Sequence, residues 1–90
     1  MKIEFDLTKR QQTLEARGLD MARVNEVFSG VTLTVEDDRK DYGETRYITI
    51  GRLEGRMIVM VWTTRGAARR IISMRKANDR EQEIYGPRLG

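Results

Sequence analysis

Arginine is the residue type in this chain that is best suited to bind a charged ligand, and it is concentrated in the second half. Residues 46–90 carry ten Lys/Arg and four Asp/Glu, a net charge of +6, whereas residues 1–45 carry seven and ten, a net charge of −3. Thirteen of the 17 cations are arginines. The planar guanidinium fits phosphate at two points, which an ammonium does not. The distribution indicates a polyanionic partner, nucleic acid first, against the simpler alternative of a solvated basic surface.

Several of these arginines lie in or beside segments that alternate like strands: Arg46, Arg52, Arg65, Arg69, Arg70 and Arg75. Their chemistry suits the cleavage of RNA, in which a 2′-hydroxyl attacks the neighbouring phosphorus and negative charge builds up on the phosphate oxygens. Preformed cationic donors stabilise that charge, and the loss of one such donor typically raises the barrier by about 3 kcal/mol. Such a reaction requires no metal ion.

The group that would move the proton is less well defined by the sequence. Arginine stays protonated in proteins and is therefore a poor proton acceptor. A carboxylate beside several arginines has a lowered pKa, which weakens it as a base. The proton-handling residues in this half of the chain are Tyr47, Lys76, Glu81, Glu83 and Tyr85.

Composition excludes several other chemistries. The chain has no histidine and no cysteine, which removes disulfides, histidine or thiolate metal sites and histidine-assisted nucleophiles. A glycine-rich phosphate loop is missing. The acidic residues 36–38 lack the ligand spacing of a calcium loop, so we expect residues 36–44 to form a solvated loop. We therefore expect neither a metal nor a cofactor.

Length and apolar patterning predict one cytoplasmic domain over residues 1–90. The chain lacks a run of about 18 apolar residues, which a membrane-spanning helix would need. Its first six residues mix acidic and apolar side chains and contain no apolar stretch of the kind found in a signal peptide.

The N-terminal part of the chain predicts a strand followed by a helix. Residues 1–5 alternate between apolar and charged side chains, which is typical of a half-buried strand. Thr8 and Gln11 have the spacing of a capping box, and the glycine at position 18 is a helix stop, so we expect a helix over residues 9–17.

A second helix and then a change of period follow. Asp20 can cap a helix over residues 21–28, where apolar residues recur at intervals of three and four. Beyond it the apolar residues alternate, which predicts strands. We expect strands at residues 31–35, 45–53, 56–64 and 68–75. The last three are joined by short links, such as the two-residue turn Glu54-Gly55, and should form an antiparallel meander.

The chain closes with a predicted helix. Asn78 and Glu81 form a capping pair, and the helix should run to Tyr85, where Gly86-Pro87 breaks it. The predicted fold is therefore α+β, an antiparallel sheet with two N-terminal helices and one C-terminal helix.

The second half of the chain resembles the BrnT family of ribonuclease toxins. The residues that carry the likeness are Arg46, Gly51, Val59 to Gly66, Arg70 to Ala77, Glu81 and Tyr85. Phe5-Asp6-x-x-Lys9 and Gly18-Leu19 also fit the opening of the family, so the likeness covers roughly residues 3–85. Its most specific part is the Arg-Ile-Ile-Ser-x-Arg stretch at residues 70–75.

The resemblance implies a fold similar to the RelE-type toxins and cleavage of RNA without a metal. It also implies a cognate BrnA-like antitoxin with a ribbon-helix-helix domain, which neutralises the toxin and contacts operator DNA on behalf of the complex. Toxins of this family are expected to pair as a dimer within a heterotetramer that represses its own operon. Their attack on translation arrests growth.

One segment departs from the family pattern. Many members have Asn followed by Lys-His-Gly at the end of the first helix, where this chain has Thr13 and then Ala16-Arg17-Gly18. Any role of that histidine in proton transfer is lost here, although Arg17 can keep a phosphate contact. Two alternatives to an active toxin remain: a non-catalytic module that acts with its antitoxin in repression, and a translation-associated RNA-binding protein.

We expect the following residues to act in catalysis: Arg65, Arg70, Arg75, Glu81 and Tyr85. We expect these to contact RNA: Lys9, Arg17, Arg46, Trp62 and Lys76. Structural roles compete for several of them. Arg70 shares strand parity with the apolar residues 72 and 74, so an internal ion pair competes closely with catalysis. Trp62 lies on an apolar strand and is more typical of a core than of base stacking. Glu81 can be a helix cap alone.

Overall fold

The computed structural model describes residues 2–90, so Met1, which falls in the first predicted strand, lies outside the described residues. The elements are β1 (Lys2–Glu4), α1 (Leu7–Arg17), the 3-10 helix η1 (Met21–Arg23), α2 (Val24–Phe28), β2 (Leu33–Asp37), β3 (Arg46–Leu53), β4 (Arg56–Arg65), β5 (Ala68–Lys76) and α3 (Asp79–Leu89). This order confirms the predicted α+β class.

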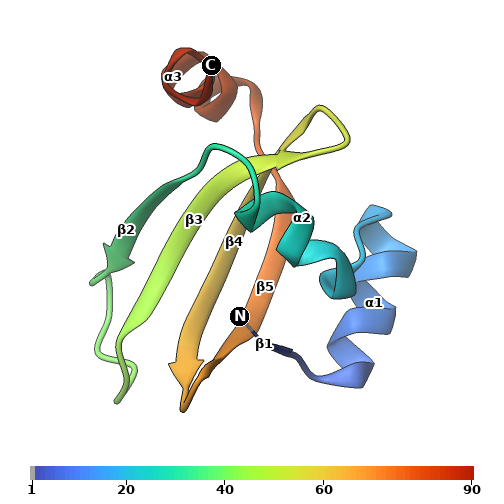
Figure 1. Cartoon of the computed structure of the whole chain (residues 1–90), viewed down its shortest axis with the longest axis vertical. Helices are drawn as coiled ribbons and strands as arrows, with labels where there is room; N and C mark the ends of the chain where they lie inside the picture. The colour runs from blue at the N-terminus through green and yellow to red at the C-terminus, as the bar shows by residue number, and fades with distance from the viewer. Residues whose placement is uncertain (1) are drawn as a thin grey trace.

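The strands of the described chain form one sheet in the order β1-β5-β4-β3-β2 (Figure 1). β2 to β5 make an antiparallel run, and β1 pairs with β5 in parallel. Glu54 and Gly55 turn β3 into β4 with φ values of 52° and 77°, the backbone form that matches the twist of a hairpin. β4 is central, as expected for a strand that is apolar on both faces.

The register divides the side chains of the sheet between two faces, and different helices cover each face. The helix-covered face carries the larger core, in which residues 19–28 pack on strand residues Leu53, Ile58, Met60, Trp62, Ile71 and Met74. The opposite side, here called the open face, carries the strand residues Leu33, Val35, Ile48, Ile50, Val59 and Val61. α3 covers one end of the open face, where Tyr85 and Leu89 belong to the same cluster as Ile50, Met57 and Val59.

α2 lies close against β3 because a glycine faces it. A Cβ built on Gly51 would lie 2.6 Å from Cγ1 of Val27 and 3.0 Å from Cγ2 of Thr32. Val27 is fully buried, so it has little room to move. The glycine therefore sets the distance between the helix and the sheet.

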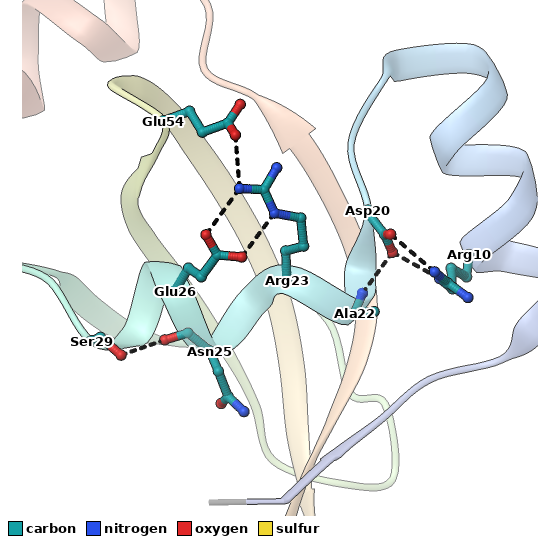
Figure 2. A network of polar contacts seen from close by, with 8 residues as sticks. All are labelled: Arg10, Asp20, Ala22, Arg23, Asn25, Glu26, Ser29 and Glu54. Atoms are coloured by element: carbon teal, nitrogen blue, oxygen red, sulfur yellow. Dashed lines mark hydrogen bonds and ion pairs between the residues drawn. The ribbon is translucent and has the colours of Figure 1, made fainter.

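Ion pairs fix the helical segment at its start and at the junction of η1 with α2 (Figure 2). Arg23 contacts Glu26 and Glu54 at 2.8 Å each, and so ties the start of α2 to the β3–β4 turn. Asp20 accepts from the backbone N–H of Ala22, which confirms its predicted capping role, and pairs with Arg10 of α1 at 2.8 Å.

α1 lies beside the edge of β5 (Figure 1). β1 pairs only with residues 68–70 of that strand. Further along, Lys9 Nζ donates to the carbonyl of Ile72 at 3.1 Å, and Arg17 donates to the carbonyl of Met74 at 2.7 Å. The two side chains thus satisfy carbonyls that an edge strand would otherwise offer to another chain.

Both terminal helices differ from the prediction at their ends. α1 begins two residues earlier than expected, because Asp6 and not Thr8 caps it by accepting from the N–H of Lys9. α3 does not stop before Gly86-Pro87 but continues to Leu89. Leu89 is 4% exposed, and its burial offsets the hydrogen bond that Pro87 cannot donate.

The acidic run also differs from the prediction of a solvated loop. Residue 37 ends β2, and its carboxylate is buried.

Residues 2–90 contain no group of three or more acidic, histidine or cysteine side chains placed to hold a metal ion. In the same part of the chain, no helix has the length and apolar character needed to cross a membrane.

Candidate active site

Cross-strand neighbours on the open face form rows that bring distant arginines together. One row runs through Asp37, Arg46, Thr63, Arg70 and Glu4, one residue from each strand. Arg75 lies in another row, opposite Val59. The two rows are four residues apart along a strand, which corresponds to about 14 Å. Both ends of the open face therefore carry guanidinium groups.

Arg70 reaches the open face because β5 contains a β-bulge. The register with β4 shifts between Val61 and Trp62, and leaves Ile72 as an extra residue. Strict alternation would have placed Arg70 on the same face as Met74, which is in the core. In the structure Arg70 is opposite Thr63 on the open face, so the expectation from parity is wrong.

The same bulge turns Arg69 toward the helix-covered face. Its guanidinium carbon lies 3.9 Å from the ring centroid of Phe28 and 5.2 Å from that of Trp62, the geometry of a cation–π contact. Its Nε is buried without a hydrogen-bond partner among the described residues. Arg69 is thus bound to the aromatic cluster and is not part of the open-face set.

A cavity of about 190 Å³ lies on the open face. Its apolar floor is made by Val35, Ile48, Ile50, Val59 and Val61. Charged and aromatic side chains stand around this floor: Arg39, Arg75, Glu81 and Tyr85. Apolar walls with a few polar groups are typical of a ligand site, because the floor excludes water and the polar groups set the orientation.

Arg75 and Glu81 form a two-point ion pair at this cavity. The two terminal guanidinium nitrogens of Arg75 donate to the two carboxylate oxygens of Glu81 at 2.7 and 2.8 Å. Glu81 also completes the predicted capping box with Asn78, which is thereby confirmed. The hydrogen bond from Arg75 lowers the pKa of Glu81 to about 2, against the opposing effect of burial. A carboxylate with so low a pKa is a weak base, which favours a structural role for Glu81.

Tyr85 is the other predicted proton-handling residue at the cavity. It lies one turn after Glu81 on α3, is half-buried and packs against the smaller apolar cluster. A phenolic hydroxyl can both donate and accept a hydrogen bond. Tyr85 is therefore the group at this cavity best suited to exchange a proton with a ligand that Arg75 holds.

Glu44 organises the arginines at the other end of the open face. It contacts Arg46 at 3.1 Å and Arg65 at 3.4 Å. The guanidinium of Arg46 also lies 4.1 Å above the ring centroid of Tyr42. Arg46 and Arg65 keep exposed side-chain surface, 26% and 52%, so these contacts orient them without removing them from solvent.

The remaining predicted RNA-contacting residues do not join the cavity. Lys9 and Arg17 line a separate groove beside the β5 edge together with Ser73, and the exposed Lys76 lines a hollow at the β3–β4 turn. Trp62 is 8% exposed, and its indole N–H donates to Thr49 at 2.8 Å.

The rings around Trp62 leave no room for a nucleobase. Tyr47 lies 4.7 Å from the Trp62 ring centroid and Phe28 meets it edge-on at 5.7 Å. This placement corresponds to the core alternative and not to base stacking.

Sequence reasoning missed two residues at the open face, Arg39 and Glu44. Both lie in the segment for which a solvated loop was predicted, and there the charge of a side chain does not show which way it points. A usable signal was present for one of them: an aspartate two residues before Arg39 has the spacing at which its side chain accepts from the backbone N–H of Arg39. For Glu44 no signal in the sequence distinguishes it from its acidic neighbours.

Comparison with known proteins identifies the family. Residues 5–81 match the family model described as "Ribonuclease toxin, BrnT, of type II toxin-antitoxin system". The match spans most of the chain and includes the cavity residues Arg75 and Glu81, while Tyr85 lies just beyond it. No curated protein matches the chain. The five-stranded, mostly antiparallel sheet with three helices is consistent with the RelE-like fold that the resemblance implies. The chain belongs to the BrnT family of ribonuclease toxins of type II toxin–antitoxin systems.

Proposed function

We propose that this toxin is a metal-independent endoribonuclease whose active site is the cavity on the open face. The observation that carries the proposal is the position of Arg75, which Glu81 holds at two points beside Tyr85 above an apolar floor. Preorganised donors of this kind stabilise developing charge without having to reorganise during the reaction.

The reaction is transesterification within the RNA strand. The 2′-oxygen forms a bond to the adjacent phosphorus, and the bond from phosphorus to the 5′-oxygen breaks, which yields a 2′,3′-cyclic phosphate and a 5′-hydroxyl. The proton of the 2′-hydroxyl passes to solvent water, and one proton arrives at the 5′-oxygen. Arg75 binds the non-bridging oxygens, Tyr85 supplies the proton to the leaving oxygen, and Glu81 positions Arg75.

The remaining arginines bind the strand on one side of the cleaved bond. Arg46 and Arg70 lie toward the far end of the open face, about 14 Å from the row of Arg75, and Arg65 lies about 20 Å from that row. Phosphate contacts at these distances set the register of the strand without reading its sequence. Lys9, Arg17 and Lys76 lie outside this path and contribute to the general attraction of RNA.

A cognate antitoxin belongs to any type II system, and we propose that here it has a ribbon-helix-helix domain and covers the open face. Only the antitoxin contacts operator DNA, within a heterotetramer that holds two toxins. Free toxin degrades RNA in the cytoplasm and thereby inhibits translation. The binding of an acidic antitoxin surface to these arginines should weaken with added salt.

Cleavage of purified RNA in EDTA by the antitoxin-free protein tests the proposal. Arg75→Ala should lower the cleavage rate by about 100-fold or more, the loss typical of a single donor to a developing oxyanion. Arg65→Ala should reduce it less, because its contact is to a flanking phosphate, and Tyr85→Phe should slow release of the 5′-oxygen. Arg56→Ala removes an exposed arginine at the β3–β4 turn and is the matched control. Equal rates in all variants would remove the site assignment.

A non-catalytic toxin-like module that acts only with its antitoxin is the second candidate. The observation in its favour is Arg17, which donates to the Met74 carbonyl at the place where many family members have a histidine. The same assay separates the two functions. A parent protein that binds its antitoxin and represses its operon, but leaves RNA intact in every buffer, has the second function.

A further inference from the structure

We infer that Arg39 is a phosphate-binding residue of the open-face cavity, and that Asp37 and Tyr42 are positioning residues that present it. The inference rests on the proposed function, because it adds a second phosphate ligand to the same site. Arg39 lies in the β2–β3 loop, on the opposite side of the cavity from Arg75, and both arginines line it.

A buried carboxylate holds Arg39 in place. Asp37, the last residue of β2, accepts from Nε and from a terminal nitrogen of Arg39 at 2.8 and 2.9 Å. The hydroxyl of Tyr42 donates to the same carboxylate at 3.2 Å. The hydrogen bonds from Arg39 lower the pKa of Asp37 to about 2, so this carboxylate is charged at neutral pH.

The exposures of the two partners differ sharply. The side chain of Asp37 is 1% exposed, whereas that of Arg39 is 69% exposed. A guanidinium has five N–H donors, and the side-on contact with Asp37 uses two of them. The outer edge of the guanidinium, with three donors, is therefore free to bind an anion while the inner edge is held.

The cavity brings this free edge near a second cation. β2 and β5 are separated by two strands, about 14 Å across the sheet, and Asp37 at the end of β2 is also offset along the strands from the row of Arg75. The side chains nevertheless converge on one cavity of about 190 Å³. The hydrogen bond to Glu81 raises the pKa of Arg75, and the charge of Arg39 opposes this effect to a smaller extent. An anion between the two guanidinium groups would relieve their repulsion.

The ion pair between Asp37 and Arg39 does not include Arg46, which supports a specific role for Arg39 in the cavity. Asp37 is directly opposite Arg46 in the register, yet Arg46 pairs with Glu44 and stacks on Tyr42. The carboxylate of Asp37 thus orients Arg39 and does not orient Arg46, which is the cross-strand neighbour of Asp37. Arg39 lines the cavity together with Val35 and Ile48 of its floor. This arrangement gives one phosphodiester two guanidinium ligands on opposite sides.

Two RNA probes test the role of Arg39 in the full chain. A 2′-O-methylated oligoribonucleotide, which has no attacking hydroxyl, measures binding, and the unmodified oligoribonucleotide measures cleavage, both in EDTA. Arg39→Ala should weaken binding of the methylated probe by about tenfold, as expected for one charge-assisted contact. The slope of log K against log salt should fall by about 0.7, the value for one phosphate contact on a single strand. Lys40→Ala, which removes the same charge from the next residue, should change neither slope nor cleavage.

A double-mutant cycle tests the positioning residues. Tyr42→Phe and Asp37→Asn should each weaken binding several-fold in the parent chain, and should have no further effect on binding in the Arg39→Ala background. A merely structural role for Asp37 or Tyr42 would weaken binding equally in both backgrounds. Tyr42→Phe leaves the buried carboxylate in place, so it decides the question even if Asp37→Asn does not fold.

The outcomes separate this inference from the proposed function. If the parent binds and cleaves, and Arg39→Ala matches Lys40→Ala in affinity and slope, the role of Arg39 is overturned and the active site stands. If the parent binds the methylated probe but does not cleave the unmodified one, catalysis is overturned, and the change in slope still decides on Arg39. A parent that neither binds nor cleaves overturns both.

Discussion

The guanidinium of Arg75 on β5 and the carboxylate of Glu81 on α3 meet through two hydrogen bonds of 2.7 and 2.8 Å. Glu81 belongs at the same time to the capping box of α3. One carboxylate therefore joins the proposed phosphate ligand to the start of the helix that carries Tyr85. The positions of Arg75 and Tyr85 depend on each other through this residue.

Glu81 should make the stability of the fold depend on pH in the acid range. Its pKa is lowered from about 4.5 to about 2 in the folded protein, so the folded state binds the proton less tightly than the unfolded chain. The stabilisation is present above the unfolded value and is lost as pH falls through 4.5 toward 2. Denaturant unfolding of Glu81→Gln should therefore show a smaller loss of stability over this range than the parent. Glu83→Gln on the exposed side of α3 is the control, and a parallel profile for all three proteins would contradict the prediction.

At position 51 even a methyl side chain should lower the stability of the fold. A methyl group there would lie 2.6 Å from Cγ1 of the buried Val27, so α2 would have to move. We expect Gly51→Ala to lower the free energy of unfolding by about 1–3 kcal/mol, the usual cost of overpacking. Gly86→Ala makes the matched comparison, because its nearest contact would be an ordinary 3.9 Å to Met57 and helix interiors favour alanine over glycine. Equal stabilities of the two variants would mean that α2 can move away from the sheet without lowering the free energy of unfolding.

Lys9 should contribute to stability more than to RNA binding. Its Nζ donates to the Ile72 carbonyl at the edge of β5, at 3.1 Å. Lys9→Met keeps the length of the side chain and removes the donor, and should cost about 1 kcal/mol in the free energy of unfolding. Lys2→Met, in which the replaced lysine makes no hydrogen bond among the described residues, serves as control. A variant with native stability and strongly reduced RNA affinity would assign Lys9 to the substrate instead.

Restoring the family residues at positions 16 and 17 tests whether the groove beside β5 takes part in cleavage. Arg17 donates to the Met74 carbonyl there and does not line the open-face cavity. An imidazole at position 17 would titrate between pH 5 and 8, whereas a guanidinium does not. Because position 17 lies outside the proposed site, we expect the double variant Ala16→Lys, Arg17→His to cleave RNA at the parent rate across this range. A rate that is several-fold higher and follows the ionisation of the new histidine would place proton transfer in that groove and contradict the open-face site.

The order of elements could be predicted because local sequence determines it. The capping box of Asn78 and Glu81, the cap at Asp20 and the hairpin turn at Glu54–Gly55 all depend on neighbouring residues, and each is present. The end of α3 depends on the burial of Leu89 against a distant strand, and the pattern around Pro87 contains no trace of that contact.

The site was less predictable because its geometry depends on contacts between strands. A single extra residue at Ile72 exchanges the faces of Arg69 and Arg70, and alternation within β5 cannot show where a partner strand shifts. Arg39 looks like one charge among many in an acidic segment until β2 brings Asp37 into a buried position. Arg75 could be assigned to the correct face of the sheet, the face of Ser73, because no irregularity lies between these two residues.

The parallel pairing of β1 with β5 has a consequence for biosynthesis. Residue 2 pairs with residue 68, so the first strand to leave the ribosome has no partner until most of the chain has been made. β5 and α3, which carry Arg75, Glu81 and Tyr85, follow all the other elements in chain order. The proposed cleavage site therefore cannot assemble before synthesis has passed residue 85, because Arg75 on β5 is held by Glu81 on α3.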